Sequence, residues 1–238
     1  MKWTQKNSKQ LALWLSQNSL DRWANFGQDG RGNVLAAINF AKTGDVGDGR
    51  PKAINPLISS WLGQVCDELR PDLLDSERFK VLLPLACEVP ADKKTQQRIF
   101  VALLDRFWEL TGSFTGLAHS EGIGHRWDKM CRQRDHKAVI NVFTAINSPT
   151  QDHRLGVVVE WMLWLTAHEI NPRQKLRPRV LADMTRNRCS HTFVTSLAKM
   201  YVELSALSEG FPSGGRQFGE KHVGFLYELI AVGNQAKR

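Results

Sequence analysis

The stretch KKTQQRIFVALLDRFWELTG, residues 93–112, decides the expected fold because its apolar residues recur at helical spacing. The members that follow one another every three or four positions are Ile99, Leu103, Phe107 and Leu110. Charged residues occupy much of the rest of the stretch, which is typical of an amphipathic helix with one face on a core. Gly112 follows the last apolar position and is expected to end the helix.

The same reading extends to the neighbouring segments. In NPLISSWLGQVCDELRP (55–71), Asn55 is expected to cap a helix, Pro56 to occupy its first turn and Pro71 to end it. The segment 147–172 contains three consecutive valines, but its length and apolar continuation favour a buried helix over a strand. The segment 179–210 is one long helix or two helices joined near Cys189–Ser190, and a last helix is expected over residues 217–232.

These patterns predict an all-α fold, an irregular bundle of about eight or nine helices. Gly- and Asp-rich stretches at 27–33 and 42–56 indicate exposed loops, and a further break is expected at 111–124. We therefore divide the chain into an N-terminal helical segment, residues 1–55, and a main helical domain, residues 56–238.

Composition restricts the functional classes. The formal net charge is +8 and the isoelectric point about 9.5, which favours polyanionic partners such as nucleic acid. The four cysteines form no CxxC pair, which argues against a zinc ribbon or a disulfide framework, and no apolar run reaches membrane-spanning length. Phosphate-binding loops and nucleophile signatures are also missing from the sequence. We expect a cytoplasmic protein with no metal, no cofactor and no membrane contact.

Two arginine-rich segments are the candidate nucleic-acid-binding sites. HRWDKMCRQRDHK (125–137) contributes Arg126, Lys129, Arg132, Arg134 and Lys137, which we expect on one continuing helix. NPRQKLRPR (171–179) contributes Arg173, Lys175, Arg177 and Arg179, followed by Arg186 and Arg188. The planar guanidinium suits bidentate phosphate recognition, and Trp127 could stack on a base. The alternative is a solvated face neutralised by Asp128, Asp135 and Asp183.

The segment RNRCSH (186–191) places Arg186 and Asn187 five and four positions before His191. It resembles the motif of HEPN-family ribonucleases, which are all-α. The resemblance implies that Arg186 would hold phosphate, His191 would act in acid–base catalysis without metal, and Asn187 would orient them. On a continuous helix, however, residues five apart differ by roughly 140° in direction, so convergence needs a helix break near Ser190 or a symmetric partner.

We therefore predict a non-catalytic protein that grips the phosphate backbone of RNA or DNA and forms one subunit of a larger nucleoprotein assembly with other proteins. Two alternatives stay open. One is a HEPN-like ribonuclease that uses Arg186 and His191, and the other is a protein–protein adaptor with a basic face.

Overall fold

The computed structural model describes residues 2–21, 30–45, 47, 51, 53–146, 152–167, 191–209 and 216–235. For residues 167, 191–195, 209 and 216–218 it describes the backbone alone. The elements are α1 (Gln5–Gln17), β1 (Ser19–Leu20), β2 (Arg31–Gly32), α2 (Val34–Thr43), α3 (Pro56–Cys66), α4 (Pro71–Leu74), α5 (Glu77–Cys87), α6 (Lys93–Gly112), α7 (Thr115–Ser120), α8 (Gly124–Gln133), α9 (His136–Phe143), α10 (His153–Ala167), α12 (His191–Glu209) and α13 (Arg216–Asn234). The prediction of an all-α fold is confirmed, with one short parallel strand pair beside the helices.

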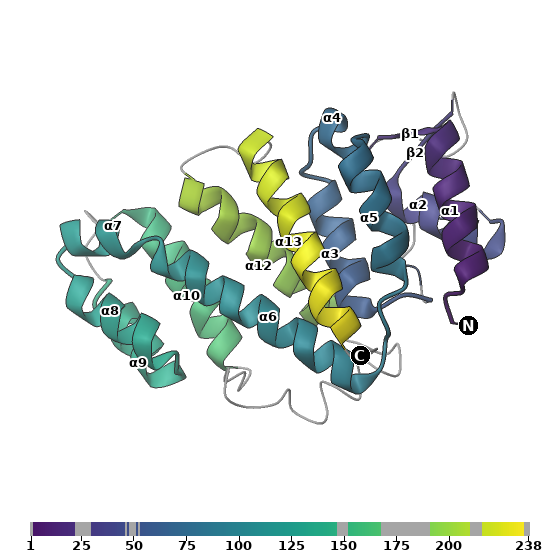
Figure 1. The fold of residues 1–238 in the computed structure, drawn as a ribbon. Coiled ribbons are helices and arrows are strands. Elements are labelled where there is room, and N and C mark those ends of the chain that lie inside the picture. The colour runs from purple at the N-terminus through teal and green to yellow at the C-terminus, as the bar shows by residue number, and fades with distance from the viewer. Residues whose placement is uncertain are drawn as a thin grey trace.

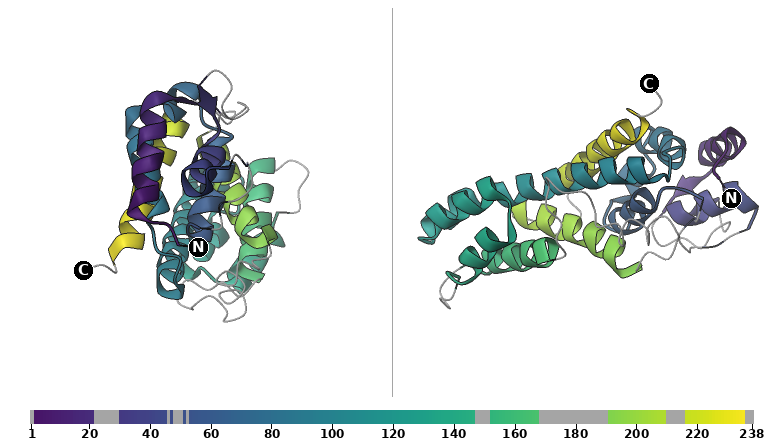
Figure 2. Two further views of the ribbon diagram at one scale, coloured as in Figure 1. Left: turned by 90° about the vertical axis from the view of Figure 1, so that its right-hand side faces the viewer. Right: turned by 90° about the horizontal axis from the view of Figure 1, so that it is seen from below.

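Helix α6 runs through the middle of an elongated molecule (Figure 1). It packs against α3, α12 and α13, and it also contacts α8. The tip formed by α7, α8 and α9 lies at one end of the molecule, and α1 and α2 lie at the other, as the view from below also shows (Figure 2). The two ends are therefore connected through a helix that takes part in the core along its length.

The bounds of α6 agree with the expectation from its sequence. Asp92 caps the helix: its Oδ1 accepts a hydrogen bond from the Thr95 N–H at 3.0 Å, and its Oδ2 accepts one from the Thr95 hydroxyl at 2.8 Å. Although burial opposes ionisation, these hydrogen bonds lower the pKa of Asp92. Phe100 and Phe107 are fully buried on the apolar face, where each contributes about 1.5–3 kcal/mol to folding.

Helix α3 begins as expected but ends earlier. Asn55 is fully buried and accepts from the backbone N–H of Leu57 at 3.0 Å, while its amide donates to the carbonyl of Pro90 at 2.8 Å. The expected end at Pro71 is wrong, because α3 ends at Cys66 and Pro71 is the first residue of α4. Proline lacks the N–H that a first helical turn leaves unpaired, so it starts this helix at little cost.

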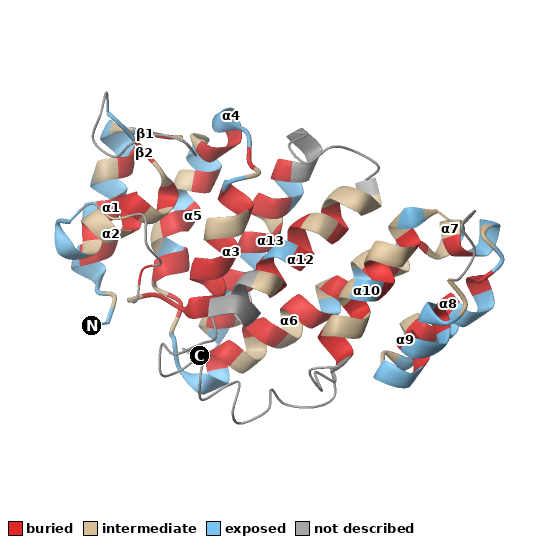
Figure 3. Cartoon of the chain, turned by 180° about the vertical axis from the view of Figure 1, so that it is seen from behind, coloured by how far each residue is buried: buried red, intermediate tan, exposed pale blue. Residues whose placement is uncertain are grey.

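The core is continuous along the described chain. Figure 3 shows the buried residues on the inward faces of neighbouring helices. Leu11 of α1 and Ile38 of α2 belong to the same apolar cluster as the buried side chains of α3 and α6. The division of the chain at residue 55 stays a prediction. The described residues contain more helices than expected, because α4 and α7 are short helices in segments where none was foreseen.

Candidate nucleic-acid interface

The basic segment 125–137 forms a helical hairpin instead of the single helix expected from its sequence. Helix α8 ends at Gln133 and is capped by Arg134, which adopts the left-handed conformation with φ 51° and ψ 38°. Its N–H donates to the carbonyl of Met130 at 2.8 Å. Asp135 then begins α9, because its Oδ1 accepts from the N–H of Ala138 at 2.8 Å. The chain reverses over two residues, so Lys137 lies on a different helix from Arg126 and Lys129.

Several apolar residues of the hairpin point into the core and include Trp127, whereas Ile140 and Phe143 of α9 are exposed. This side chain is fully buried, and its indole N–H donates to the carbonyl of Thr111 at 3.1 Å. The expectation that Trp127 could stack on a base is therefore wrong. Met130 on α8 and Val139 and Val142 on α9 are also fully buried. The burial of these residues fixes which side of the hairpin faces solvent.

The contact between α7 and α8 removes the acidic residue of α8 from the solvent-facing side. A Cβ atom at Gly124 would lie 2.3 Å from the ring of His119, so the approach of the two helices requires glycine. His119 Nε2 and Asp128 Oδ2 lie 3.0 Å apart. Asp128 is the only carboxylate in α8, and α9 contains none. The outward side of the hairpin is consequently free of acidic side chains from its own helices.

Four cations lie on this outward side: Arg126, Lys129, Arg132 and Lys137. All four are exposed, and no ion pair among the described residues involves any of them. Arg134 differs, because its Nη1 lies 3.0 Å from Asp105 Oδ1 of α6. We call the four cations together with His125, Asn141 and Thr144 the α8–α9 face.

A groove of about 430 Å³ lies between the two helices on this face. Helix α8 lines it with His125, Arg126 and Lys129, and α9 lines it with Ala138, Asn141 and Thr144. The α9 residues recur every three positions, so this spacing in the sequence could have identified them once the helix break was known. The groove thus combines two unpaired cations with an imidazole, an amide and a hydroxyl.

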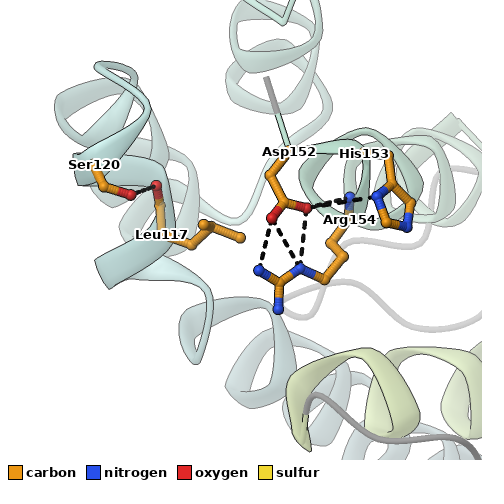
Figure 4. Close-up of polar contacts among 5 residues, drawn as sticks. All are labelled: Leu117, Ser120, Asp152, His153 and Arg154. Atoms are coloured by element: carbon orange, nitrogen blue, oxygen red, sulfur yellow. Dashed lines mark hydrogen bonds and ion pairs between the residues drawn. The ribbon is translucent and has the colours of Figure 1, made fainter. Parts of the chain in front are cut away.

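At the beginning of α10, in contrast, Arg154 is paired with Asp152 (Figure 4). Arg154 Nη2 lies 2.6 Å from Asp152 Oδ2, and Arg154 Nε lies 3.0 Å from Asp152 Oδ1. These side-chain hydrogen bonds from Arg154 lower the pKa of Asp152 to about 2. Close by in the figure, at the end of α7, the Ser120 hydroxyl donates to the carbonyl of Leu117 at 2.8 Å. The guanidinium of Arg154 is thus already engaged by a carboxylate.

The second basic segment lies outside the described residues. Its members are Arg173, Lys175, Arg177, Arg179, Arg186 and Arg188. Asn187 also lies there, and His191 is the first residue of α12, where the backbone alone is described. The predicted phosphate contacts of this segment and the HEPN-like arrangement of Arg186 and His191 stay predictions.

Other chemistry has little support in the described residues. Burial, together with the nearby Asp128, raises the pKa of Cys131 to about 11, so its thiol is protonated at neutral pH and is a poor nucleophile. Cys66, Cys87 and Cys131 are not in disulfides. Within the described ranges, no three side chains of His, Cys, Asp or Glu gather as metal ligands would. In the same ranges, no helix combines the length and apolar character that crossing a membrane requires.

No protein-family model, curated protein or solved structure matches the chain.

Proposed function

We propose that the protein binds the phosphate backbone of nucleic acid through the α8–α9 face. The observation that carries the proposal is the set of four exposed cations on two consecutive helices, none of which has a carboxylate partner among the described residues and two of which, Arg126 and Lys129, line the groove. Cations that have no internal partner remain available to an external polyanion. Each phosphate they neutralise releases condensed counterions, which favours binding.

The chemistry of the groove fits phosphate oxygens. Arg126 offers a planar fork of N–H donors, and Lys129 offers a compact point charge beside it. The Asn141 amide can donate a further hydrogen bond to phosphate or sugar oxygens, whereas the Thr144 hydroxyl donates to the Asn141 carbonyl at 3.2 Å. Trp127 is buried, and the exposed Phe143 of α9 is not among the described residues that line the groove. We therefore propose binding that depends little on base stacking and on sequence.

The groove also supports nucleic acid over an acidic protein surface as the partner. Its lining provides several polar donors within one concave strip, as a continuous phosphate backbone requires. Membership of a larger nucleoprotein assembly and a cytoplasmic location remain part of the proposal on the grounds of charge and cysteine spacing in the sequence. RNA and DNA share the phosphate chemistry, and the experiment below includes both.

The test is fluorescence anisotropy with labelled single-stranded and duplex RNA and DNA at several salt concentrations. The variant Arg126→Ala/Lys129→Ala is compared with Arg78→Ala/Lys94→Ala, which removes the same charge from exposed positions on α5 and α6. We expect the first variant to weaken binding and to lower the slope of log K against log salt by about 1 for each lost phosphate contact. Equal effects of the two variants would show that net charge, and not the α8–α9 face, is responsible. An acidic protein partner would instead be indicated by the absence of any nucleic-acid binding at low salt.

A further inference from the structure

A second polar pocket, of about 330 Å³, lies between α6, α12 and α13. These three helices pack against one another near the middle of the molecule (Figure 1). Helix α6 contributes Arg106 and Glu109, α12 contributes Tyr201, and α13 contributes Lys221 and His222. The pocket is separate from the α8–α9 face, with which it has no lining residue in common.

The guanidinium of Arg106 is held in place by aromatic residues. Its Cζ lies 5.4 Å from the ring centroid of Phe225, which is close enough for a cation–π contact. The rings of Phe225 and Tyr201 stack with centroids 5.0 Å apart, and the Tyr201 ring lies 4.9 Å from that of His222. A buried aromatic cluster beside the pocket therefore supports the guanidinium of Arg106.

The pocket contains a buried donor that no acceptor among the described residues satisfies. Arg106 Nε is buried and has no hydrogen-bond acceptor among the described residues. Burial raises the pKa of Tyr201 although its hydroxyl interacts with Arg106 and Ser205, so this group stays uncharged and does not repel an anion. Ser205 adds a hydroxyl from α12 and Lys221 adds a second cation, whereas the Ser208 hydroxyl donates to the carbonyl of Ser205 at 2.9 Å. The described lining of the pocket thus combines two cations with one carboxylate.

That carboxylate belongs to Glu109, and its position suggests what the pocket accommodates. Glu109 Oε2 lies 3.0 Å from Arg106 Nη1, but the Glu109 side chain is 60% exposed whereas that of Arg106 is 28% exposed. A pair between residues three apart on a helix in which the carboxylate is largely exposed contributes little to stability, so an incoming anion can displace Glu109 at low cost. Glu109 thus occupies a place on Arg106 that the anionic group of a ligand could take.

We propose that this pocket binds a small oxyanion, a phosphate or carboxylate group carried by a small molecule, with Arg106 as the main contact and Glu109 as an internal competitor. The volume lies at the lower end of the range for small-molecule sites, which fits a compact ligand. The proposal does not depend on the nucleic-acid-binding function, because it concerns other residues on other helices.

The experiment uses the full chain carrying Arg126→Ala/Lys129→Ala, so that anion binding at the α8–α9 face is weakened. Inorganic phosphate, malonate and sodium chloride of matched ionic strength are titrated by calorimetry. Indole N–H signals are followed in parallel by NMR. The indole signal of Trp61 should move on binding, because its ring lies 6.2 Å from that of Tyr201 and 6.4 Å from that of His222. The indole signal of Trp127, which lies beneath the α8–α9 face, serves as the control.

We expect saturable binding of phosphate, malonate or both, a loss of at least about tenfold in affinity in Arg106→Gln, and a several-fold gain in Glu109→Gln. The gain in Glu109→Gln keeps the proposal falsifiable if Arg106→Gln folds poorly, because position 109 is exposed. The proposal is overturned if chloride reproduces the effect, if Trp61 does not respond to either anion, or if Glu109→Gln leaves the affinity unchanged. Oligonucleotide binding by Arg106→Gln in an otherwise wild-type chain reports separately on the α8–α9 face.

Discussion

Arg126 and Arg106 are both supported by the same continuous core, yet their surroundings assign them different physical roles. Arg126 is exposed on the α8–α9 face and has no carboxylate partner in the part of the chain that the structure describes, whereas Arg106 is half-buried, paired with Glu109 and in contact with the ring of Phe225. An exposed, unpaired cation interacts with any polyanion and is weakened by salt. A cation held by packing interacts at short range with one ligand of the right shape. Equal charge in one helical fold can therefore support two kinds of recognition.

The largest expected effect is a loss of stability when the buried side chain beneath the α8–α9 face is removed. Trp127→Ala should lower the free energy of unfolding by about 3–5 kcal/mol, because a fully buried indole and its hydrogen bond to Thr111 are lost. Urea denaturation measures the loss, and hydrogen exchange should place the increased opening in α8 and α9. Anion binding in the pocket of Arg106 should persist in the folded fraction. If Trp127→Ala abolished both oligonucleotide binding and anion binding in the folded fraction, the α8–α9 face and the pocket of Arg106 would not be independent.

Charge reversal should affect the two regions unequally. Arg126→Glu/Lys129→Glu is expected to weaken oligonucleotide binding by about tenfold or more at low salt, since two phosphate contacts become repulsions. The stability of this variant should change by less than about 0.5 kcal/mol per substitution, because neither cation has a described ion-pair partner to lose. Anisotropy and urea denaturation provide the two readouts. If this variant bound oligonucleotides with unchanged affinity but unfolded at lower urea, the cations would serve stability and not binding, which contradicts the role we give to Arg126.

A smaller effect is expected from the paired cation at the start of α10. Asp152 has a pKa of about 2 in the folded chain against about 3.9 in an unfolded one, so its contribution to stability is present above about pH 4 and is lost as the pH falls towards 2. Asp152→Asn should remove that part of the pH dependence and leave stability above pH 5 slightly reduced. Urea midpoints measured between pH 2 and pH 7 give the comparison. Parallel curves for wild type and variant over the whole range would be inconsistent with the ion pair.

The smallest expected effect is at His191 of the segment RNRCSH (186–191). His191→Ala should leave oligonucleotide binding unchanged, because we assign binding to cations and not to this histidine. The control is incubation of wild type and variant with RNA in EDTA, with the products separated on a gel. Cleavage that disappears in His191→Ala would favour the ribonuclease alternative over the proposed function.

The sequence predicted much of the helical framework because local signals determine it. The apolar periodicity of residues 93–112 and the cap at Asn55 involve neighbours within one or two turns, and the structure confirms both. The same periodicity places Trp127 and Met130 on one apolar face of α8 with Ile123 before them, a signal that was available but was outweighed by the surrounding charges.

Two features of the candidate sites could not be predicted in the same way. The end of α8 at Arg134 is marked by neither glycine nor proline, and a left-handed arginine costs free energy locally that tertiary packing has to offset. The pocket around Arg106 brings together side chains from three helices far apart in the sequence. Such convergence depends on packing between helices and leaves no fixed spacing in the chain.

The left-handed residue at position 134 has a consequence for how this surface can evolve. Glycine there would relieve a backbone cost of about 1 kcal/mol but would remove the contact with Asp105, which is worth roughly 0–1 kcal/mol at this exposure. The two changes nearly cancel, so selection for stability alone is almost indifferent between arginine and glycine. Because both residues can adopt the left-handed conformation, either one keeps the chain reversal between α8 and α9, and the hairpin tolerates this exchange with little cost to the fold.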